Sequence, residues 1–285
     1  MIEVKRVSVI GLGVMGSGIS EVMARSGMEV YAVDVNDECI RRGLDRIKQS
    51  MGKALERGKI TKDEYEGSLS RIKTTTSLKE AVKDIDLVIE CVPENMELKK
   101  ALFREVEMLC PQHAIISSNT SSLSITSLAS ALKRQDRFVG FHFFNPAPIM
   151  KLVEVIRGAN TSDETVETVV KVAERCGKVP VVVNDAPGFV STRMHAAFVL
   201  EAMRILQEGV ATAKAIDDIA KLGYNHPMGP LELADLMGLD VVLDIYEYLA
   251  QEYGERFKPP SILKKLVNAG HLGRKTGKGF YTYKR

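Results

Sequence analysis

One of the five histidines stands where it could move a proton. His142 directly follows the apolar run 138–141, at the predicted end of a strand, and ligands of open α/β sheets bind outside such carboxyl ends. An imidazole titrates near neutral pH, so it is a common general base for a hydroxyl proton. A strand-end histidine with satisfied hydrogen bonds is the alternative, and the residues alone leave both interpretations open. The remaining histidines, which we interpret as structural, are His113, His195, His226 and His271.

A carboxylate is available to orient this imidazole. Glu154 stands in the alternating segment 151–156, on the same side as Leu152 and Ile156, so its side chain is expected on a buried or semi-buried face. A buried carboxylate needs a partner. Folding the segment back beside His142 would supply one, with the carboxylate fixing the tautomer and stabilising the charged imidazole.

Ser121 is the third candidate for chemistry. It belongs to the polar run 117–122, which follows the apolar residues 114–116, and a hydroxyl at this strand end could hydrogen-bond a substrate oxygen. Helix capping explains one serine of such a run. It does not explain the whole cluster.

A glycine turn near the N-terminus predicts a phosphate-binding site. The β-branched run 7–10 leads into a G-x-G-x-x-G sequence, followed by a helical pattern and a second strand that ends in Asp34. In such a turn the first glycine permits the bend, the second admits a pyrophosphate and the third lets helix and strand pack closely. The Asp34 carboxylate suits ribose hydroxyls and repels a 2′-phosphate, which favours NAD over NADP. The predicted cofactor-binding turn consists of Gly11, Leu12, Gly13, Val14, Met15 and Gly16.

Further charged residues have two interpretations each. Glu94 and Lys99 follow the predicted strand 86–90 and are plausible cofactor neighbours, although Glu94 could equally satisfy the dipole of the next helix. In the basic helical pattern 38–57, Ser50 and Lys53 could meet phosphates of a long acidic substrate. An exposed solvated face is the favoured interpretation of that helix.

The elements between these residues predict a Rossmann-type, doubly wound α/β sheet in residues 1–186 and an all-helical unit in residues 187–285. Capping boxes are expected at Thr61 and Ser77. Helical patterns fill the second unit, over residues 190–208, 213–222, 230–237, 240–253 and 261–268. A unit of about 100 residues is small to complete a core alone, so we expect dimerisation through it.

Composition excludes several classes. Lys+Arg 39 against Asp+Glu 37 gives a net charge of +2, which offers no case for nucleic acid or anionic membrane. The four cysteines lack metal-ligand spacing, so no metal site is expected. The sequence shows neither a signal peptide nor a transmembrane segment, and a cytoplasmic location is the default expectation.

Taken together, these residues resemble the L-3-hydroxyacyl-CoA dehydrogenase family, and within it the short bacterial-type 3-hydroxybutyryl-CoA dehydrogenases. The likeness covers nearly the whole chain. The motifs that carry it are GLGVMG (11–16), ECVPE (90–94), SSNTSSLSIT (117–126), GFHFFNPAPIMKLVEVI (140–156), DAPGF (185–189), HPMGPLELADLMGLD (226–240) and GRKTGKGFY (273–281).

The resemblance implies an NAD-binding domain, a helical dimerisation domain and reversible oxidation of a 3-hydroxyacyl-CoA, with acetoacetyl-CoA as the expected short product. It implies that His142 is the catalytic base, Glu154 its electrostatic partner and Ser121 a contact of the substrate's C3 oxygen. The positions that match the family's cofactor contacts are Asp34, Glu94, Lys99, Ser121, Asn145 and Lys275, and those expected to meet the acyl-CoA are Ser121, Asn145, Ser50 and Lys53. The helix around Ser50 and Lys53 differs in spacing from the family pattern.

One position departs from the family. Where its members read G-F-[IV]-x-N-R, this chain reads GFVSTR over residues 188–193, so Thr192 replaces an active-site amide. A threonine hydroxyl is shorter, so a water or Ser191 would share the role, and we expect retained but altered activity. Two alternatives stay open: a 3-hydroxy acid dehydrogenase acting without CoA, and a non-catalytic NAD-binding relative.

Overall fold

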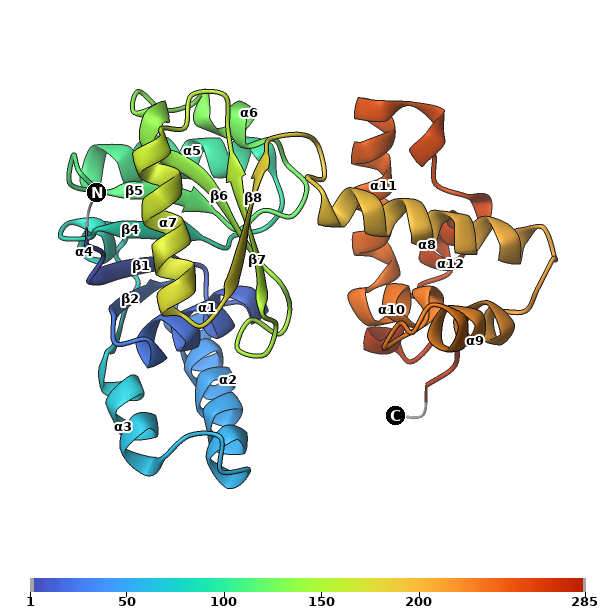
Figure 1. The fold of residues 1–285 in the computed structure, drawn as a ribbon, viewed down its shortest axis with the longest axis horizontal. Coiled ribbons are helices and arrows are strands. Elements are labelled where there is room, and N and C mark those ends of the chain that lie inside the picture. Colours follow the sequence, from blue (N-terminus) through green and yellow to red (C-terminus); the bar gives the residue numbers. More distant parts are fainter. Residues whose placement is uncertain (1–2, 284–285) are drawn as a thin grey trace. The chain divides into compact units, whose positions relative to one another are not determined.

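The computed structural model of the protein describes residues 3–283. The chain divides into two compact units, residues 1–186 and 187–285 (Figure 1).

The first unit is built on one eight-stranded sheet with the order β3-β2-β1-β4-β5-β6-β7-β8. Its central strands are short apolar runs that are buried throughout, as expected for parallel strands covered on both faces. The strands are β1 (Arg6–Ile10), β2 (Glu29–Val33), β3 (Ile72–Thr75), β4 (Leu87–Glu90), β5 (Ile115–Ser118), β6 (Phe138–Phe143), β7 (Leu152–Arg157) and β8 (Val179–Asn184).

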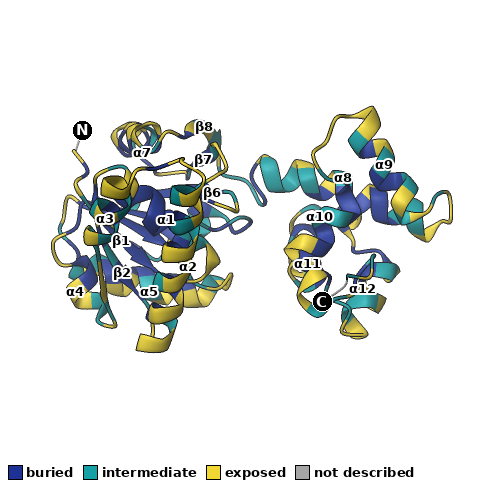
Figure 2. Ribbon diagram, turned by 90° about the horizontal axis from the view of Figure 1, so that it is seen from below, coloured by how far each residue is buried: buried dark blue, intermediate teal, exposed yellow. Residues whose placement is uncertain are grey.

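Helices cover both faces of this sheet. On one face, α1 and α7 share an apolar core with the strands, whereas α5 lies on the other, where the Phe103 ring packs edge-on against Phe138 (Figure 1). Figure 2 shows the sheet as the buried layer and exposed residues on the outer sides of the helices. The helices of this unit are α1 (Val14–Arg25), α2 (Asp37–Glu56), α3 (Lys62–Ser70), α4 (Leu78–Val82), α5 (Met96–Leu109), α6 (Ile125–Ala129) and α7 (Asp163–Arg175), with a 3-10 turn at Gln135–Arg137.

The expected doubly wound α/β sheet is confirmed, with one reversal. All neighbouring strands are parallel except β6 and β7, which run antiparallel. The connection 144–151 between them is too short for the helical crossover that parallel strands require. In the resulting ladder His142 stands opposite Glu154.

Of the two predicted capping boxes, one is complete and the other has only one of its two hydrogen bonds. At Thr61 both reciprocal hydrogen bonds are present. At Ser77 the hydroxyl accepts the N–H of Glu80, but the Glu80 carboxylate binds the hydroxyl of Thr75 instead of the backbone N–H of Ser77. The prediction of a full box at Ser77 is therefore wrong, because a nearer hydroxyl competes for the carboxylate.

The second unit is all helical, as predicted. Its core is apolar and includes Tyr246, whose hydroxyl donates to the carbonyl of Ala196. Two buried carboxylates, Asp217 and Asp235, bind the C-terminal tail by accepting from Tyr281 and Tyr283 and from backbone N–H groups. The helices are α8 (Ser191–Gln207), α9 (Ala213–Gly223), α10 (Pro230–Met237), α11 (Leu239–Tyr253) and α12 (Ser261–Asn268), with 3-10 turns at Glu255–Phe257 and Arg274–Thr276.

Within residues 3–283, none of the helices has both the length and the apolar character needed to cross a lipid bilayer.

Candidate active site

The three glycines of the turn between β1 and α1 occupy different environments. Gly11 has φ +91°, a conformation that favours glycine. A Cβ on Gly16 would lie 1.7 Å from the carbonyl oxygen of Gly11, so only a glycine lets the helix pack this closely. A Cβ on Gly13 would meet nothing within 4 Å. The open side of the turn is therefore at Gly13.

The start of α1 suits a diphosphate. Gly13 is the N-cap, no side chain caps the helix, and the first turn carries no acidic residue, so backbone N–H groups face the open side. Asp34, at the end of β2, accepts the N–H groups of Leu12 and Val35, each at 2.7 Å. These bonds fix the carboxylate beside the turn with lone pairs left for two ribose hydroxyls. The residues fit NAD.

His142 and Glu154 form a buried pair. The distance from His142 Nδ1 to Glu154 Oε2 is 2.9 Å, and the side chains are 8% and 3% exposed. The antiparallel ladder places them opposite each other on one face. A carboxylate at this distance can fix the orientation of the imidazole ring, which is the arrangement of a general base and its orienting partner.

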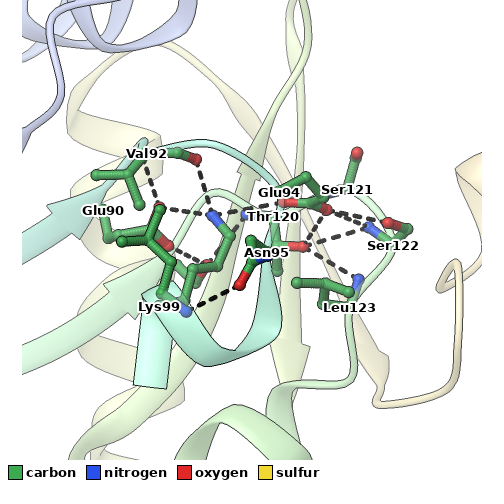
Figure 3. A network of polar contacts seen from close by, with 11 residues as sticks. Glu90, Val92, Glu94, Asn95, Lys99, Thr120, Ser121, Ser122 and Leu123 are labelled. Carbon is green, nitrogen blue, oxygen red and sulfur yellow. Dashed lines mark hydrogen bonds and ion pairs between the residues drawn. The ribbon is translucent and has the colours of Figure 1, made fainter. Parts of the chain in front are cut away.

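Glu94 binds the segment that carries Ser121. Its Oε1 accepts from the Thr120 hydroxyl at 2.5 Å and from the N–H of Ser121 at 3.2 Å. The same oxygen also accepts from the backbone N–H and the hydroxyl of Ser122 (Figure 3). Burial raises the pKa of Glu94, but Lys99 and these donors outweigh that effect and leave it below the ordinary value. Asn95, not Glu94, caps α5.

Lys99 lies beneath Glu94 and is 1% exposed. Its Nζ contacts Glu90 Oε1 at 2.6 Å and Glu94 Oε2 at 3.4 Å. The structure thus brings Glu94, Lys99 and Ser121 together at the carboxyl end of β4 and β5, next to the glycine turn, where the N–H of Cys91 bonds the carbonyl of Ile10.

The other predicted residues lie elsewhere in the fold. Asn145 is exposed in the connection after β6, and Lys53 is exposed on α2. Ser50, also on α2, is half-buried and lies near the carboxyl of the buried Glu21. In the second unit, Thr192 is half-buried in the first turn of α8, and Lys275 pairs with Asp240 at 2.5 Å.

Among residues 3–283, no group of three or more His, Cys, Asp or Glu side chains could hold a metal ion.

Two family models together match almost the whole chain. The one described as "3-hydroxyacyl-CoA dehydrogenase, NAD binding domain" matches residues 6–186. The one described as "3-hydroxyacyl-CoA dehydrogenase, C-terminal domain" matches residues 188–283. The chain belongs to the 3-hydroxyacyl-CoA dehydrogenase family.

Individual relatives agree with this family. A probable 3-hydroxybutyryl-CoA dehydrogenase of Bacillus subtilis (strain 168) is 47% identical over 282 residues, which cover 99% of this chain and 98% of the relative. A 3-hydroxybutyryl-CoA dehydrogenase of Clostridioides difficile is 44% identical over 98% of this chain and 100% of its own length. The crystal structure of (S)-3-hydroxybutyryl-CoA dehydrogenase PaaH1 from Ralstonia eutropha has a TM-score of 0.94 and 40% identity, covering 99% of this chain and 100% of that chain. This 3-hydroxyacyl-CoA dehydrogenase therefore uses NAD to oxidise its substrate.

Sequence reasoning missed three polar residues that hold the site of this dehydrogenase. Glu90 is a fully buried carboxylate under Lys99. The side chain of Asn119 accepts the N–H of Phe143, next to His142, at 2.8 Å. Asp185 accepts from the Ser124 hydroxyl and from two N–H groups at the start of α6. For Glu90 a signal was present, since a carboxylate ends the apolar run of β4.

Proposed function

We propose that the chain catalyses the reversible oxidation of (S)-3-hydroxybutyryl-CoA to acetoacetyl-CoA, with His142 as the general base. The observation that carries this proposal is the 2.9 Å contact between His142 Nδ1 and Glu154 Oε2 inside the sheet. Support for a short acyl chain comes from relatives that are named 3-hydroxybutyryl-CoA dehydrogenase.

In this mechanism the protein handles the proton. Bound NAD supplies a nicotinamide that accepts the hydride from C3 of the substrate. Since Nδ1 of His142 is turned to Glu154, Nε2 is the nitrogen that takes the proton of the C3 hydroxyl. Glu154 stabilises the resulting imidazolium without being protonated itself. In the reverse direction His142 returns the proton to the same oxygen.

We assign contacts with the substrate to three polar side chains. The Ser121 hydroxyl binds the C3 oxygen and Asn145 the neighbouring polar groups, and both residues also border the nicotinamide. Thr192 stands where the family has an amide side chain, and its hydroxyl contacts the substrate directly or through a water. These roles rest on matching positions in the family motifs.

Charged residues hold the two long anionic ligands. Residues 11–16 and Asp34 bind the NAD diphosphate and adenine ribose, with Glu94, Lys99 and Lys275 near its nicotinamide end; Lys99 acts from beneath Glu94. Ser50 and Lys53 on α2 meet the CoA portion. Lys53 is exposed and can turn toward a phosphate, whereas Ser50 is half-buried.

We also propose that the second unit mediates a homodimer. Large apolar side chains on it are exposed, including Met194, Leu222 and Tyr224, and such side chains on a small helical unit are typical of an interface. A cytoplasmic location stays a prediction from the sequence.

An activity assay tests the proposal. Purified protein should oxidise NADH when acetoacetyl-CoA is added, and His142→Ala should lose ~10²–10⁴-fold in kcat. His271→Ala is the matched control and should retain full activity, because that histidine lies in the tail of the second unit.

The alternatives give different outcomes in the same assay. Faster turnover of free 3-hydroxybutyrate than of its thioester would favour a 3-hydroxy acid dehydrogenase without CoA. No turnover of any acyl-CoA from C4 to C16 would favour a non-catalytic relative and reject the proposal.

A further inference from the structure

Glu90 is a carboxylate with no access to solvent or ligand. It ends β4, and its side chain is 0% exposed. Both oxygens are engaged: Oε1 accepts from Lys99 Nζ and from the N–H of Val92, each at 2.6 Å, and Oε2 accepts from the Ser118 hydroxyl at 2.7 Å. Any effect of Glu90 on catalysis must therefore pass through other residues.

Lys99 links Glu90 to Glu94, which is nearer the surface. Lys99 Nζ donates to Glu90 Oε1 at 2.6 Å and to the carbonyl of Val92 at 3.1 Å, and it forms an ion pair with Glu94 Oε2 at 3.4 Å. Its position is thus fully determined by its neighbours. The ammonium joins a buried carboxylate to a carboxylate at the rim of the site (Figure 3).

Glu94 ends this chain of contacts on the Ser121 segment. Its other oxygen gathers the Thr120 hydroxyl and the N–H groups of Ser121 and Ser122. Glu90 also reaches the same segment from below, since its carbonyl accepts the N–H of Asn119 and its carboxylate accepts from Ser118. Residues 118–122 are therefore held from both sides.

Stability alone does not explain this arrangement. Removing charges from water costs several kcal/mol for each ion, and a well-packed apolar substitute for a buried ion pair is often equally stable or more so. An ion pair does, however, define one geometry where an apolar pair would allow several. Here the defined geometry is that of the Ser121 backbone.

We propose that Glu90 is a positioning residue for Ser121: by fixing Lys99 it fixes Glu94, and Glu94 sets the place of the Ser121 hydroxyl in the site. This inference rests on the role given to Ser121 in the proposed function. Glu90→Gln keeps the shape and the Oε1 acceptor but removes the charge that holds Lys99, so Ser121 loses its fixed place while the fold retains its packing.

A double-mutant cycle tests the proposal through kcat/KM for acetoacetyl-CoA. Glu90→Gln should lower kcat/KM about tenfold in the wild-type background and less than about twofold in the Ser121→Ala background, because the coupled residues act as a unit. A general loosening of the fold would not produce this coupling.

The control is Glu107→Gln, on helix α5, which also carries Lys99. The Glu107 carboxylate accepts two backbone N–H groups, from Lys133 and Arg134, and these belong to a different loop. This variant should lower Tm, leave kcat/KM unchanged and show no coupling to Ser121→Ala.

Two outcomes would overturn the inference. Equal losses from Glu90→Gln in both backgrounds would reject it and leave the proposed function intact. No loss in Ser121→Ala alone would instead reject the role of Ser121, and with it this inference. Should Glu90→Gln not fold, Glu94→Gln takes its place in the cycle, since that side chain is 38% exposed and its substitution is less disruptive; the same coupling is expected.

Discussion

Glu154 places a carboxyl group inside the sheet, where such a group is costly to bury. Its proposed task is to stabilise the imidazolium of His142. Glu154→Gln keeps the hydrogen bond and removes the charge, so we expect kcat to fall ~10–100-fold, the range of a charge-assisted hydrogen bond. The KM for NADH should change little.

Stopped-flow or steady-state kinetics of NADH oxidation would measure this. The exposed Glu174→Gln on α7 is the control. An unchanged kcat for Glu154→Gln would contradict the assignment of the pair.

The role of residue 192 can be tested by a substitution that is expected to increase activity. Thr192→Asn lengthens the side chain and adds a second donor, so we expect kcat/KM for acetoacetyl-CoA to rise severalfold as a direct contact replaces a bridged one. A kcat/KM equal to that of the parent enzyme would show that position 192 does not serve the reaction.

Individual site residues could be predicted from the sequence where they belong to a recognisable motif. His142, Glu154 and Ser121 each follow or lie in a recognisable strand. For Glu90 the carboxylate at the end of an apolar run was the only signal, because its contact with the site depends on a lysine nine residues later reaching back beneath Glu94. Pairing of that kind is a property of the folded chain.

The glycine turn allows a test at the scale of an element. Gly13→Ala adds a methyl group to open space, so the free energy of unfolding should change by less than ~1 kcal/mol, while the KM for NADH rises at least about tenfold as the diphosphate is displaced. Gly16→Ala should instead destabilise the unit by ~3 kcal/mol or more, because its Cβ would overlap the Gly11 carbonyl.

Thermal unfolding and KM measurements on both variants separate binding from packing. A Gly13→Ala enzyme with the parent KM would show that no cofactor phosphate approaches this backbone.

The start of β1 is tied to β4 through Asp86, which accepts the N–H groups of Lys5 and Arg6 and contacts His113. Burial raises the pKa of Asp86, but these hydrogen bonds outweigh burial and lower it overall. Since the folded pKa lies below the unfolded value of about 3.9, the stabilisation is fully present above that value. It is lost as the pH falls through the folded pKa.

We therefore expect Asp86→Asn to lower the free energy of unfolding by ~1–2 kcal/mol at neutral pH. The difference from the parent should shrink as the pH is lowered past about 3.9. Urea unfolding at several pH values measures this, and a difference that is independent of pH would contradict it.

Helices and strands could be predicted where a periodic hydrophobic pattern extends over many residues. The helices of the second unit lie within one or two residues of the predicted ranges, because Gly and Pro punctuate them. Strand β3 was missed: Ile72–Thr75 has one large apolar residue and is only partly buried, so no pattern marks it. The antiparallel orientation of β7 is set by its pairing with other strands, and a local sequence pattern does not contain that information.

At the scale of the whole molecule, the apolar surface of the second unit predicts the oligomer. Ile219 and Leu222 lie on one side of α9 and are 57% and 86% exposed. Light scattering should give twice the 31.5 kDa of the chain, and Ile219→Lys/Leu222→Lys should halve that mass. Met108→Lys, at an exposed apolar site on α5, should leave it unchanged.

The fold class followed from alternation of strand and helix patterns up to residue 184 and their absence afterwards. A near-neutral net charge gave no indication of the anionic ligands, because the groups that suit them, such as the open backbone at Gly13, carry no formal charge. Local geometry, not total charge, distinguishes this molecule from other α/β proteins of its size.

The antiparallel ladder between β6 and β7 has a consequence for insertions and deletions. A shift of β7 by one residue would turn Glu154 to the opposite face of the sheet from His142. Strand β8 pairs with β7 along its whole length and holds it from the other side. A single residue gained within either strand should thus abolish turnover in engineered or divergent enzymes.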